Sequence, residues 1–106
     1  MRNEQSIITV NFNGLEDTCA LIDSIPFNDE SLEVIVVDNA SKTDEASLIS
    51  RRYPWVRIVR SDRNLGFAGG NNLGIRAAKG KYLYFVNNDT VLDFKDDSSR
   101  KADKGC

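Results

Sequence analysis

The stretch of sequence that decides the fold is Lys81-Tyr82-Leu83-Tyr84-Phe85-Val86-Asn87-Asn88-Asp89-Thr90-Val91. Residues 82–86 are a short run of aromatic and aliphatic side chains, which predicts a buried β-strand. The polar residues 87–90 continue a strand poorly and therefore mark its end. Because open α/β sheets bind ligands beyond the carboxyl ends of their strands, Asp89 is a candidate ligand-binding carboxylate. The alternative interpretation is that residues 87–90 form only a turn.

Upstream of this stretch, the chain alternates between strand-like and helix-like segments. We expect strands at residues 6–10, 32–37 and 56–59, followed in turn by helices at residues 15–25, 41–53 and within 65–80. The unbroken aliphatic run of residues 34–37 indicates a strand that is buried on both faces, as in a parallel sheet. The element order βαβαβαβ therefore predicts a three-layer, mostly parallel α/β fold with right-handed crossovers.

Polar residues and glycines mark the expected ends of these helices. Asn13 is expected to cap the first helix, and Ser41 with Asp44 has the spacing of a capping box for the second. Pro26 is expected to end the first helix, and Gly80 is expected at the C′ position of the third. Glycines within that third helix each reduce its stability by roughly 1 kcal/mol relative to alanine. We therefore expect them to allow a close approach to the sheet or to a ligand.

The composition is that of one ordinary soluble domain. The 106 residues are 41% hydrophobic and 28% charged, and the formal net charge of −2 argues against a nucleic-acid partner. No apolar run is long enough to span a membrane, and two cysteines do not form a disulfide framework. We therefore expect a cytoplasmic protein with an α/β domain at residues 1–92 and a polar, disordered tail at residues 93–106.

Two aspartates are expected to share one edge of the predicted sheet. Asp38 follows the strand at residues 32–37, just as Asp89 follows the strand at residues 82–86. Their mutual repulsion must be offset by a cation or a hydrogen-bond donor, and carboxylate oxygens suit Mg²⁺ or Mn²⁺. The chain contains no histidine, no P-loop motif and no dinucleotide-binding fingerprint. The remaining chemistry is a metal-assisted diphosphate site, although a single aspartate in such a place is also a common turn residue.

Four blocks of sequence carry a resemblance to a known family. They are Ile7-Ile8-Thr9-Val10-Asn11-Phe12-Asn13, Val36-Val37-Asp38-Asn39-Ala40-Ser41, Asn64-Leu65-Gly66-Phe67-Ala68-Gly69-Gly70-Asn71-Asn72-Leu73-Gly74-Ile75 and Asn87-Asn88-Asp89-Thr90. In this order they resemble the family 2 glycosyltransferases, and within them the rhamnosyltransferase-like members. The resemblance covers residues 6–91 and implies the N-terminal, nucleotide-binding half of a GT-A fold.

The resemblance also implies roles for individual residues. The implied nucleotide-binding residues are Val10, Asn11, Phe12, Asp38, Asn39, Gly66, Asn71 and Asn88. The first three would surround the base and ribose, and Asp38 would contact the nucleobase. Asn87 stands where the family's D-x-D motif begins, so Asp89 would be the main carboxylate ligand of the Mg²⁺ or Mn²⁺ ion. The catalytic base is unassigned, because nothing in the sequence selects Asp96 or Asp97.

The implied activity is a sugar transfer of the hexosyltransferase type. The donor would be a UDP- or dTDP-sugar, and the acceptor would be a carbohydrate or lipid-linked hydroxyl used in cell-surface polysaccharide synthesis at the inner face of the membrane. Members of the family continue past the metal motif into an acceptor-binding half that supplies the catalytic base, and residues 93–106 resemble nothing in that half. The alternatives are a non-catalytic nucleotide-binding module and a truncated fragment that self-associates through an exposed sheet edge.

Overall fold

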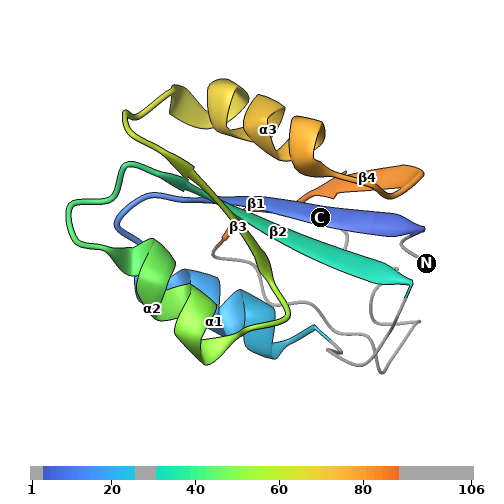
Figure 1. The fold of residues 1–106 in the computed structure, drawn as a ribbon, viewed down its shortest axis with the longest axis horizontal. Coiled ribbons are helices and arrows are strands. Elements are labelled where there is room, and N and C mark those ends of the chain that lie inside the picture. The colour runs from blue at the N-terminus through green and yellow to red at the C-terminus, as the bar shows by residue number, and fades with distance from the viewer. Residues whose placement is uncertain (1–3, 26–30, 89–106) are drawn as a thin grey trace.

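The computed structural model describes residues 4–25 and 31–88, in which strands alternate with helices (Figure 1). The elements are β1 (Gln5–Asn11), α1 (Leu15–Asp23), β2 (Leu32–Asn39), α2 (Glu45–Arg52), β3 (Arg57–Ser61), α3 (Gly66–Ala77) and β4 (Tyr82–Phe85). The strands form one sheet in the order β3-β2-β1-β4, and every neighbouring pair is parallel. Strands β1 and β2 therefore lie in the centre of the sheet, and β3 and β4 form its two edges.

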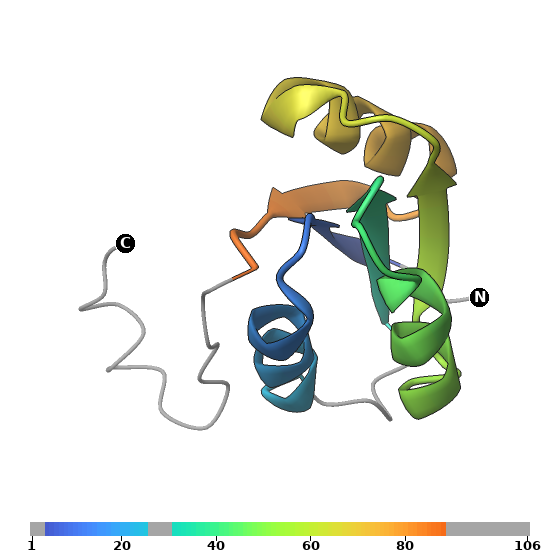
Figure 2. The same cartoon turned by 90° about the vertical axis from the view of Figure 1, so that its left-hand side faces the viewer.

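The helices divide between the two faces of the sheet. Helices α1 and α2 lie beneath the sheet in Figure 1 and α3 lies above it, and Figure 2 shows the same three layers from the side. The predicted three-layer, parallel α/β fold is thus confirmed. Because the strands run in one direction, their carboxyl ends share the edge at the left of Figure 1, where the loops into the helices begin.

Each face of the sheet has its own hydrophobic core. The core beneath the sheet contains Ile7, Cys19, Leu21, Ile22, Ile25, Val34, Val36, Ile49, Tyr53 and Val56. The core above it contains Ile8, Ile35 and Val37, with partly buried residues of α3 packed against them. Strand β2 contributes to both cores, and its residues 34–37 are at most 2% exposed. The aliphatic run was therefore correctly predicted to be buried on both faces.

Strand β4 differs from its prediction as a buried strand. Its side chains Tyr82, Tyr84 and Phe85 are 60%, 47% and 48% exposed. The reason is its place in the sheet: among the described strands, β4 pairs with β1 alone, and the main helix contacts fall on β1, β2 and β3. An apolar run predicts a strand equally well at the centre and at the edge of a sheet, and here it forms an edge.

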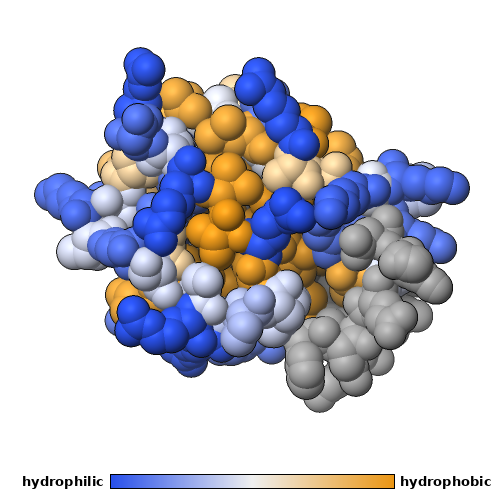
Figure 3. All heavy atoms as spheres, viewed as in Figure 1, coloured by the Kyte–Doolittle hydropathy of each residue, from blue (hydrophilic) through white to orange (hydrophobic). Residues whose placement is uncertain are grey.

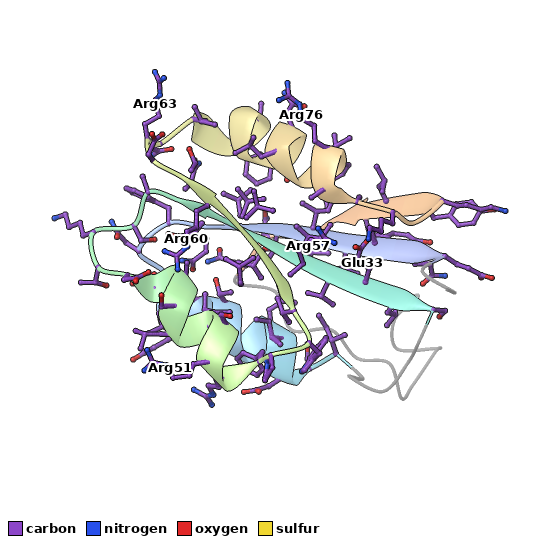
Figure 4. The ribbon with its side chains drawn as sticks, in the orientation of Figure 1. Glu33, Arg51, Arg57, Arg60, Arg63 and Arg76 are labelled. Carbon is purple, nitrogen blue, oxygen red and sulfur yellow. The ribbon has the colours of Figure 1, made fainter. Side chains whose placement is uncertain are left out.

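The opposite edge, β3, carries charged side chains. The Arg60 guanidinium lies 2.8 Å from Asp44 Oδ1 beside α2, and Arg57 Nε lies 3.7 Å from Glu33 Oε2 on the other face (Figure 4). Between them, Ile58 and Val59 pack against the two cores. Figure 3 accordingly shows apolar atoms in the middle of this side of the molecule, surrounded by charged side chains. Arginines on an edge strand oppose pairing with another chain, and β4 has no such protection in the described residues.

The expected helix caps are wrong in detail. Helix α1 begins after Gly14 without a side-chain cap, because the Asn13 side chain instead accepts a hydrogen bond from Lys42 N. Helix α2 is capped by Asp44, whose carboxylate accepts from Ser47 N, and Ser41 lies outside the helix. Asn13 and Ser41 instead connect the loop after β1 with the loop after β2, because Asn13 N donates a hydrogen bond to Ser41 Oγ. Pro26, the expected end of α1, lies outside the described residues.

Glycines bring α3 and the following loop close to the sheet, as expected. A Cβ atom at Gly70 would lie 2.9 Å from Val10 Cγ2, and one at Gly74 would overlap Ile8 Cγ2. Helix α3 ends at Ala77 with an extended C-cap residue, so Gly80 is not its C′ residue as predicted. A Cβ atom at Gly80 would lie 2.5 Å from Ser6 Oγ, which shows that this glycine serves close passage over β1.

In the described part of the chain, the helices are all too short or too polar to cross a membrane. The predicted tail at residues 93–106 lies outside the described residues, so the proposed division of the chain at residue 92 stays a prediction.

Candidate functional site

Polar side chains gather where the parallel strands end. Asn11 at the end of β1 is in register with Asp38 on β2, and Asn39 beside it is in register with Ser61 on β3. Strand β4 ends at Phe85, two residues before the Asn87-Asn88 pair. The common direction of the strands therefore brings these side chains to one edge of the sheet, as the sequence predicted for Asp38.

Two cavities open at this edge. The first has a volume of about 1010 Å³ and is lined by Asp38, Ala40, Ser41, Lys42, Thr43, Asp44, Arg60, Ser61, Asp62, Arg63, Leu65 and Leu73. The second has a volume of about 370 Å³ and is lined by Val10, Phe12, Asn39, Asn64, Gly66, Phe67, Asn87 and Asn88. The larger cavity, which we call the charged cavity, contains acidic and basic side chains. The smaller one, which we call the amide cavity, is lined by uncharged residues.

Asp38 is oriented by its neighbours and faces the charged cavity. Its Oδ1 atom accepts hydrogen bonds from Asn11 Nδ2 at 2.9 Å and from Ser41 Oγ at 2.6 Å. Its Oδ2 atom accepts none from the residues that the structure describes, although the side chain is only 6% exposed. One oxygen is thus held in place, and the other is available to accept a hydrogen bond from a ligand.

Asn11 is fully buried and contacts carboxylates instead of lining a cavity. Its Nδ2 group donates to Asp38 Oδ1 and to Glu45 Oε1, both at 2.9 Å. Its Oδ1 atom accepts from Thr18 Oγ1 at 2.6 Å. Both N–H groups of the amide and one lone pair of its oxygen are therefore used inside the protein. The structure places Asn11 behind Asp38 rather than on a surface that a ligand can touch.

Asn39 holds the loop between β3 and α3. Its Nδ2 group donates to Asn64 Oδ1 and to the Gly66 carbonyl, both at 3.0 Å, and its Oδ1 atom accepts from Leu65 N at 2.9 Å. These three bonds fix the wall of the amide cavity on the α3 side. Gly66 begins the helix with a φ of 77°, a conformation that glycine adopts without strain.

The amide cavity brings together most of the predicted nucleotide-binding residues. These are Val10, Phe12, Asn39, Gly66 and Asn88. Two exposed aromatic rings, Phe12 at 46% and Phe67 at 58%, stand at this cavity. Aromatic faces and amides suit a planar base or a sugar ring, which needs apolar contact together with neutral hydrogen-bonding groups. Asn71 lies half-buried in α3 and lines neither of the two cavities.

The two arginines that line the charged cavity differ in their partners. Arg60 is bound to Asp44 and also donates to Ser47 Oγ at 2.8 Å. Hydrogen bonds from Ser47 and Arg60 lower the pKa of Asp44 to about 2. Arg63, in contrast, makes no ion pair through its guanidinium within the described residues and lies in the loop before α3 (Figure 4). Arg63 is therefore available to bind an anionic group.

Several residues that line these cavities could not be picked out from the sequence. Lys42 and Arg63 were not singled out because an exposed basic residue in a loop carries no distinguishing pattern. Asn64 and Phe67 lie within the glycine-rich block of residues 64–75, in which only the glycines and Asn71 were predicted to have a role. A polar residue directly after a predicted strand was the pattern that indicated a site residue. Arg63 does not have this pattern, because it lies two residues beyond the end of β3.

The predicted metal ligand, Asp89, lies outside the described residues, and its distance from Asp38 stays a prediction. Within residues 4–25 and 31–88, no three Asp, Glu, Cys or His side chains are grouped so that they could hold a metal ion. Asn87 and Asn88, which directly precede Asp89, line the amide cavity. Their side-chain oxygens, like the carboxylate of Asp89, are hard ligands of the kind that Mg²⁺ and Mn²⁺ prefer. The donor types at this strand end thus fit such an ion.

Comparison with known proteins decides the family. Residues 6–99 match the family model for glycosyl transferase family 2. The chain belongs to this family. An uncharacterized glycosyltransferase of Haemophilus influenzae is 35% identical over 86 residues, which cover 79% of this chain and 29% of that protein. The match agrees with the family that the four sequence blocks predicted, but it does not distinguish the rhamnosyltransferase-like members.

Solved structures share the fold. The mannosyltransferase PcManGT from Pyrobaculum calidifontis, in complex with GDP-Man and Mn²⁺, has a TM-score of 0.73 and 27% identity. The match covers 87% of this chain and 29% of the mannosyltransferase. S. aureus TarS 1–349 in complex with UDP-GlcNAc has a TM-score of 0.74 at 23% identity, covering 93% and 30% of the two chains. The chain thus has a GT-A fold and spans about three-tenths of the length of these relatives.

Proposed function

We propose that the chain binds the nucleotide-sugar donor of a glycosyltransferase at the carboxyl edge of its sheet. The observation that carries this proposal is Asp38, whose Oδ1 atom is fixed by Asn11 and Ser41 while its Oδ2 atom is left for a ligand. A nucleobase N–H group is the natural donor to such an oxygen. The uncharged amide cavity beside it suits the ribose and the sugar.

The diphosphate would lie between these two binding regions. Arg63 and Lys42 line the charged cavity and can neutralise part of the phosphate charge. Val10 and Phe12 line the amide cavity and would contact the ribose. The sugar would then lie near Asn88, at the end of the sheet where Asp89 follows in the sequence.

A divalent metal ion, Mg²⁺ or Mn²⁺, is part of this proposal. The oxygen ligands available at residues 87–89 support it, as does the GDP-Man and Mn²⁺ complex of the similar mannosyltransferase. When bound, the ion would neutralise the negative charge that develops on the nucleoside diphosphate as it leaves. The residues of this chain would hold the donor in position for attack by an acceptor hydroxyl on the anomeric carbon. The bond between the anomeric carbon and the diphosphate would break in the same step.

The finer substrate assignments rest on similarity. UDP- and dTDP-sugars are the donors that the sequence blocks favour, and the relatives with UDP-GlcNAc and GDP-Man extend the class to GDP-sugars. A hexose transfer, of the rhamnosyltransferase-like type, to a carbohydrate or lipid-linked acceptor in cell-surface polysaccharide synthesis completes the proposal. No carboxylate lines the amide cavity among the described residues, and the catalytic base stays unassigned.

Calorimetric titration of UDP, dTDP and GDP, with and without Mn²⁺, tests the donor site. Binding to the wild-type chain should tighten with Mn²⁺, and Asp89→Ala should lose that increment. Asp38→Asn should keep the increment but bind at least roughly tenfold more weakly, as expected for loss of a hydrogen bond to a charged group. Asp62→Asn, which removes another carboxylate from the charged cavity, is the matched control. Absence of nucleotide binding, or binding that Asp38→Asn leaves unchanged, contradicts the proposal.

A second candidate function is self-association without catalysis. The exposed aromatic side chains of the edge strand β4 favour pairing with a second copy of the chain. Light scattering at high micromolar concentration should then give more than the monomer mass, and Tyr84→Lys should restore the monomer because a charge on an edge strand opposes pairing. A wild-type chain that scatters as a clean monomer would exclude this function.

A further inference from the structure

A series of side-chain hydrogen bonds beneath the sheet connects the two cavities. Asn88 Nδ2 donates to Thr18 Oγ1 at 3.1 Å, Thr18 Oγ1 donates to Asn11 Oδ1 at 2.6 Å, and Asn11 Nδ2 donates to Asp38 Oδ1 at 2.9 Å. We call these four residues the relay. Its first residue, Asn88, lines the amide cavity, and its last, Asp38, lines the charged cavity.

The two middle members of the relay, Thr18 and Asn11, each have only one workable orientation. Thr18 has a single hydroxyl hydrogen, which it donates to Asn11, so it can only accept from Asn88. The Asn11 amide cannot be reversed, because its carbonyl oxygen would then face the carboxylates of Asp38 and Glu45. Since Thr18 and Asn11 are both fully buried, water cannot replace a lost bond without a structural change.

Gly14 provides an independent sign that the relay has a defined geometry. A Cβ atom at Gly14 would lie 2.7 Å from Asn88 Nδ2, too close for an ordinary contact. The backbone of Gly14, with a φ of −126°, is one that alanine can adopt, so the residue is not needed for its conformation. The absence of a side chain at this position is what allows the Asn88 amide to reach Thr18.

We infer that Thr18 and Asn11 are positioning residues that couple the orientation of Asp38 to that of Asn88. This inference deepens the proposed function, because it predicts that the two ends of the donor site respond to each other. Neither Thr18 nor Asn11 lines the charged cavity or the amide cavity, so each acts through the residues that do. A physical coupling of this kind must be demonstrated by measuring how a change at one end alters the other.

The decisive measurement needs no ligand. In the full 106-residue chain, NMR spectra should show that Asp38→Asn shifts the side-chain amide resonances of Asn88. The shift should persist in a Thr18→Ser background, which keeps the hydroxyl, and disappear in a Thr18→Val background, which removes it. A shift that persists in Thr18→Val, or that is absent from the wild-type background, overturns the inference.

Two further variants serve as a control and as an alternative to Thr18→Val. Thr9→Val is the matched control, because Thr9 is also a buried threonine of this face but its Oγ1 atom has no hydrogen-bond partner in the described structure. The Asn88 shift should persist in that background. Gly14→Ala should abolish it by displacing Asn88, and this variant decides the question if Thr18→Val does not fold. Persistence of the shift in Gly14→Ala would contradict the inference.

Nucleotide affinity then shows the effect on the proposed function. With Mn²⁺ present, Thr18→Val should bind UDP or GDP, whichever the wild type binds more tightly, about tenfold more weakly, as for loss of one oriented hydrogen bond. Thr18→Ser should restore the wild-type affinity, and equal affinity of Thr18→Val and wild type contradicts the inference. A wild-type chain that binds neither nucleotide counts against the proposed function alone, because the NMR measurement decides the relay without a ligand.

Discussion

Beneath the sheet, helices α1 and α2 enclose a core that includes Leu21 and Ile22, both fully buried, whereas α3 above the sheet packs on three buried strand residues. The upper contact is made by bringing backbones together: Gly70 and Gly74 lie directly over side chains of β1. The lower face is stabilised by the large apolar surface that it buries. The upper face is stabilised by close packing of α3 on the sheet, which Gly70 and Gly74 allow because they have no side chain. The same sheet thus depends on large residues below and on small ones above.

Truncating a large residue below the sheet should have the greatest effect. Ile22→Ala leaves a cavity in a fully buried position, and we expect a loss of about 2–5 kcal/mol in the free energy of unfolding, measured by urea denaturation. Leu73→Ala on α3 is the matched variant above the sheet, where the side chain is only partly buried, and should lose roughly 1–2 kcal/mol. Equal losses would remove the distinction between the faces.

Enlarging a small residue above the sheet should have the next largest effect. Gly74→Ala places a methyl group against Ile8, which should reduce the free energy of unfolding by about 1–3 kcal/mol. This loss opposes the gain of roughly 1 kcal/mol that alanine normally brings to a helix. Asn72→Ala, at an exposed position of the same helix, is the control and should not destabilise the protein in thermal unfolding. A Gly74→Ala chain that is more stable than wild type would show that α3 does not depend on close approach.

A smaller effect should come from the polar contact between α1 and α2. The Tyr53 hydroxyl lies 2.7 Å from Asp23 Oδ1 and 3.2 Å from the Cys19 carbonyl, and burial together with Asp23 raises the pKa of Tyr53. Tyr53→Phe keeps the ring in the core and should lose about 1 kcal/mol of unfolding free energy, as for one hydrogen bond. A loss as large as that of Ile22→Ala would mean that polar contacts, not apolar burial, dominate the lower face.

The smallest effect should be a pH dependence at the cap of α2. The pKa of Asp44 is lowered to about 2 in the folded protein, below its ordinary value of 3.8. Its contribution to stability is therefore present above about pH 4 and is lost as the pH falls towards 2. The difference in unfolding midpoint between wild type and Asp44→Asn should shrink over this range, and Ser47→Ala should weaken the effect by removing its largest cause. A difference that does not change with pH contradicts this assignment.

The fold was predictable where residue type and burial agree. The aliphatic residues 34–37 of β2 predicted a strand buried on both faces, and the glycines of α3 predicted close approach to the sheet. The polar residue after the second strand, Asp38, was correctly expected at the carboxyl edge. These features depend on the side chain alone, so a single sequence is enough to indicate them.

Other features depend on partners that are distant in the sequence. The aromatic run of β4 looked buried, but the sheet places it at an edge where it has one neighbour. The sequence did not indicate that Thr18, Asp38 and Glu45 occupy the Asn11 amide within the protein, and the implied contact of Asn11 with the nucleotide stays a prediction. Hydrogen-bond partners up to 34 residues away cannot be inferred from local spacing, which is also why Asn13 was mistaken for a helix cap.

The strand order β3-β2-β1-β4 has a consequence for how the amide cavity can change. The chain moves outward from β1 through β2 to β3, and α3 then carries it back across the sheet to β4 on the other side of β1. The order of the strands reverses between β1 and β4, and such a topological switch point is where open α/β sheets form a ligand-binding crevice. Val10, Phe12 and Asn88 only line an opening that the path of the backbone creates. Substitution of these side chains therefore changes the lining of the opening, while the opening itself is kept by the topology.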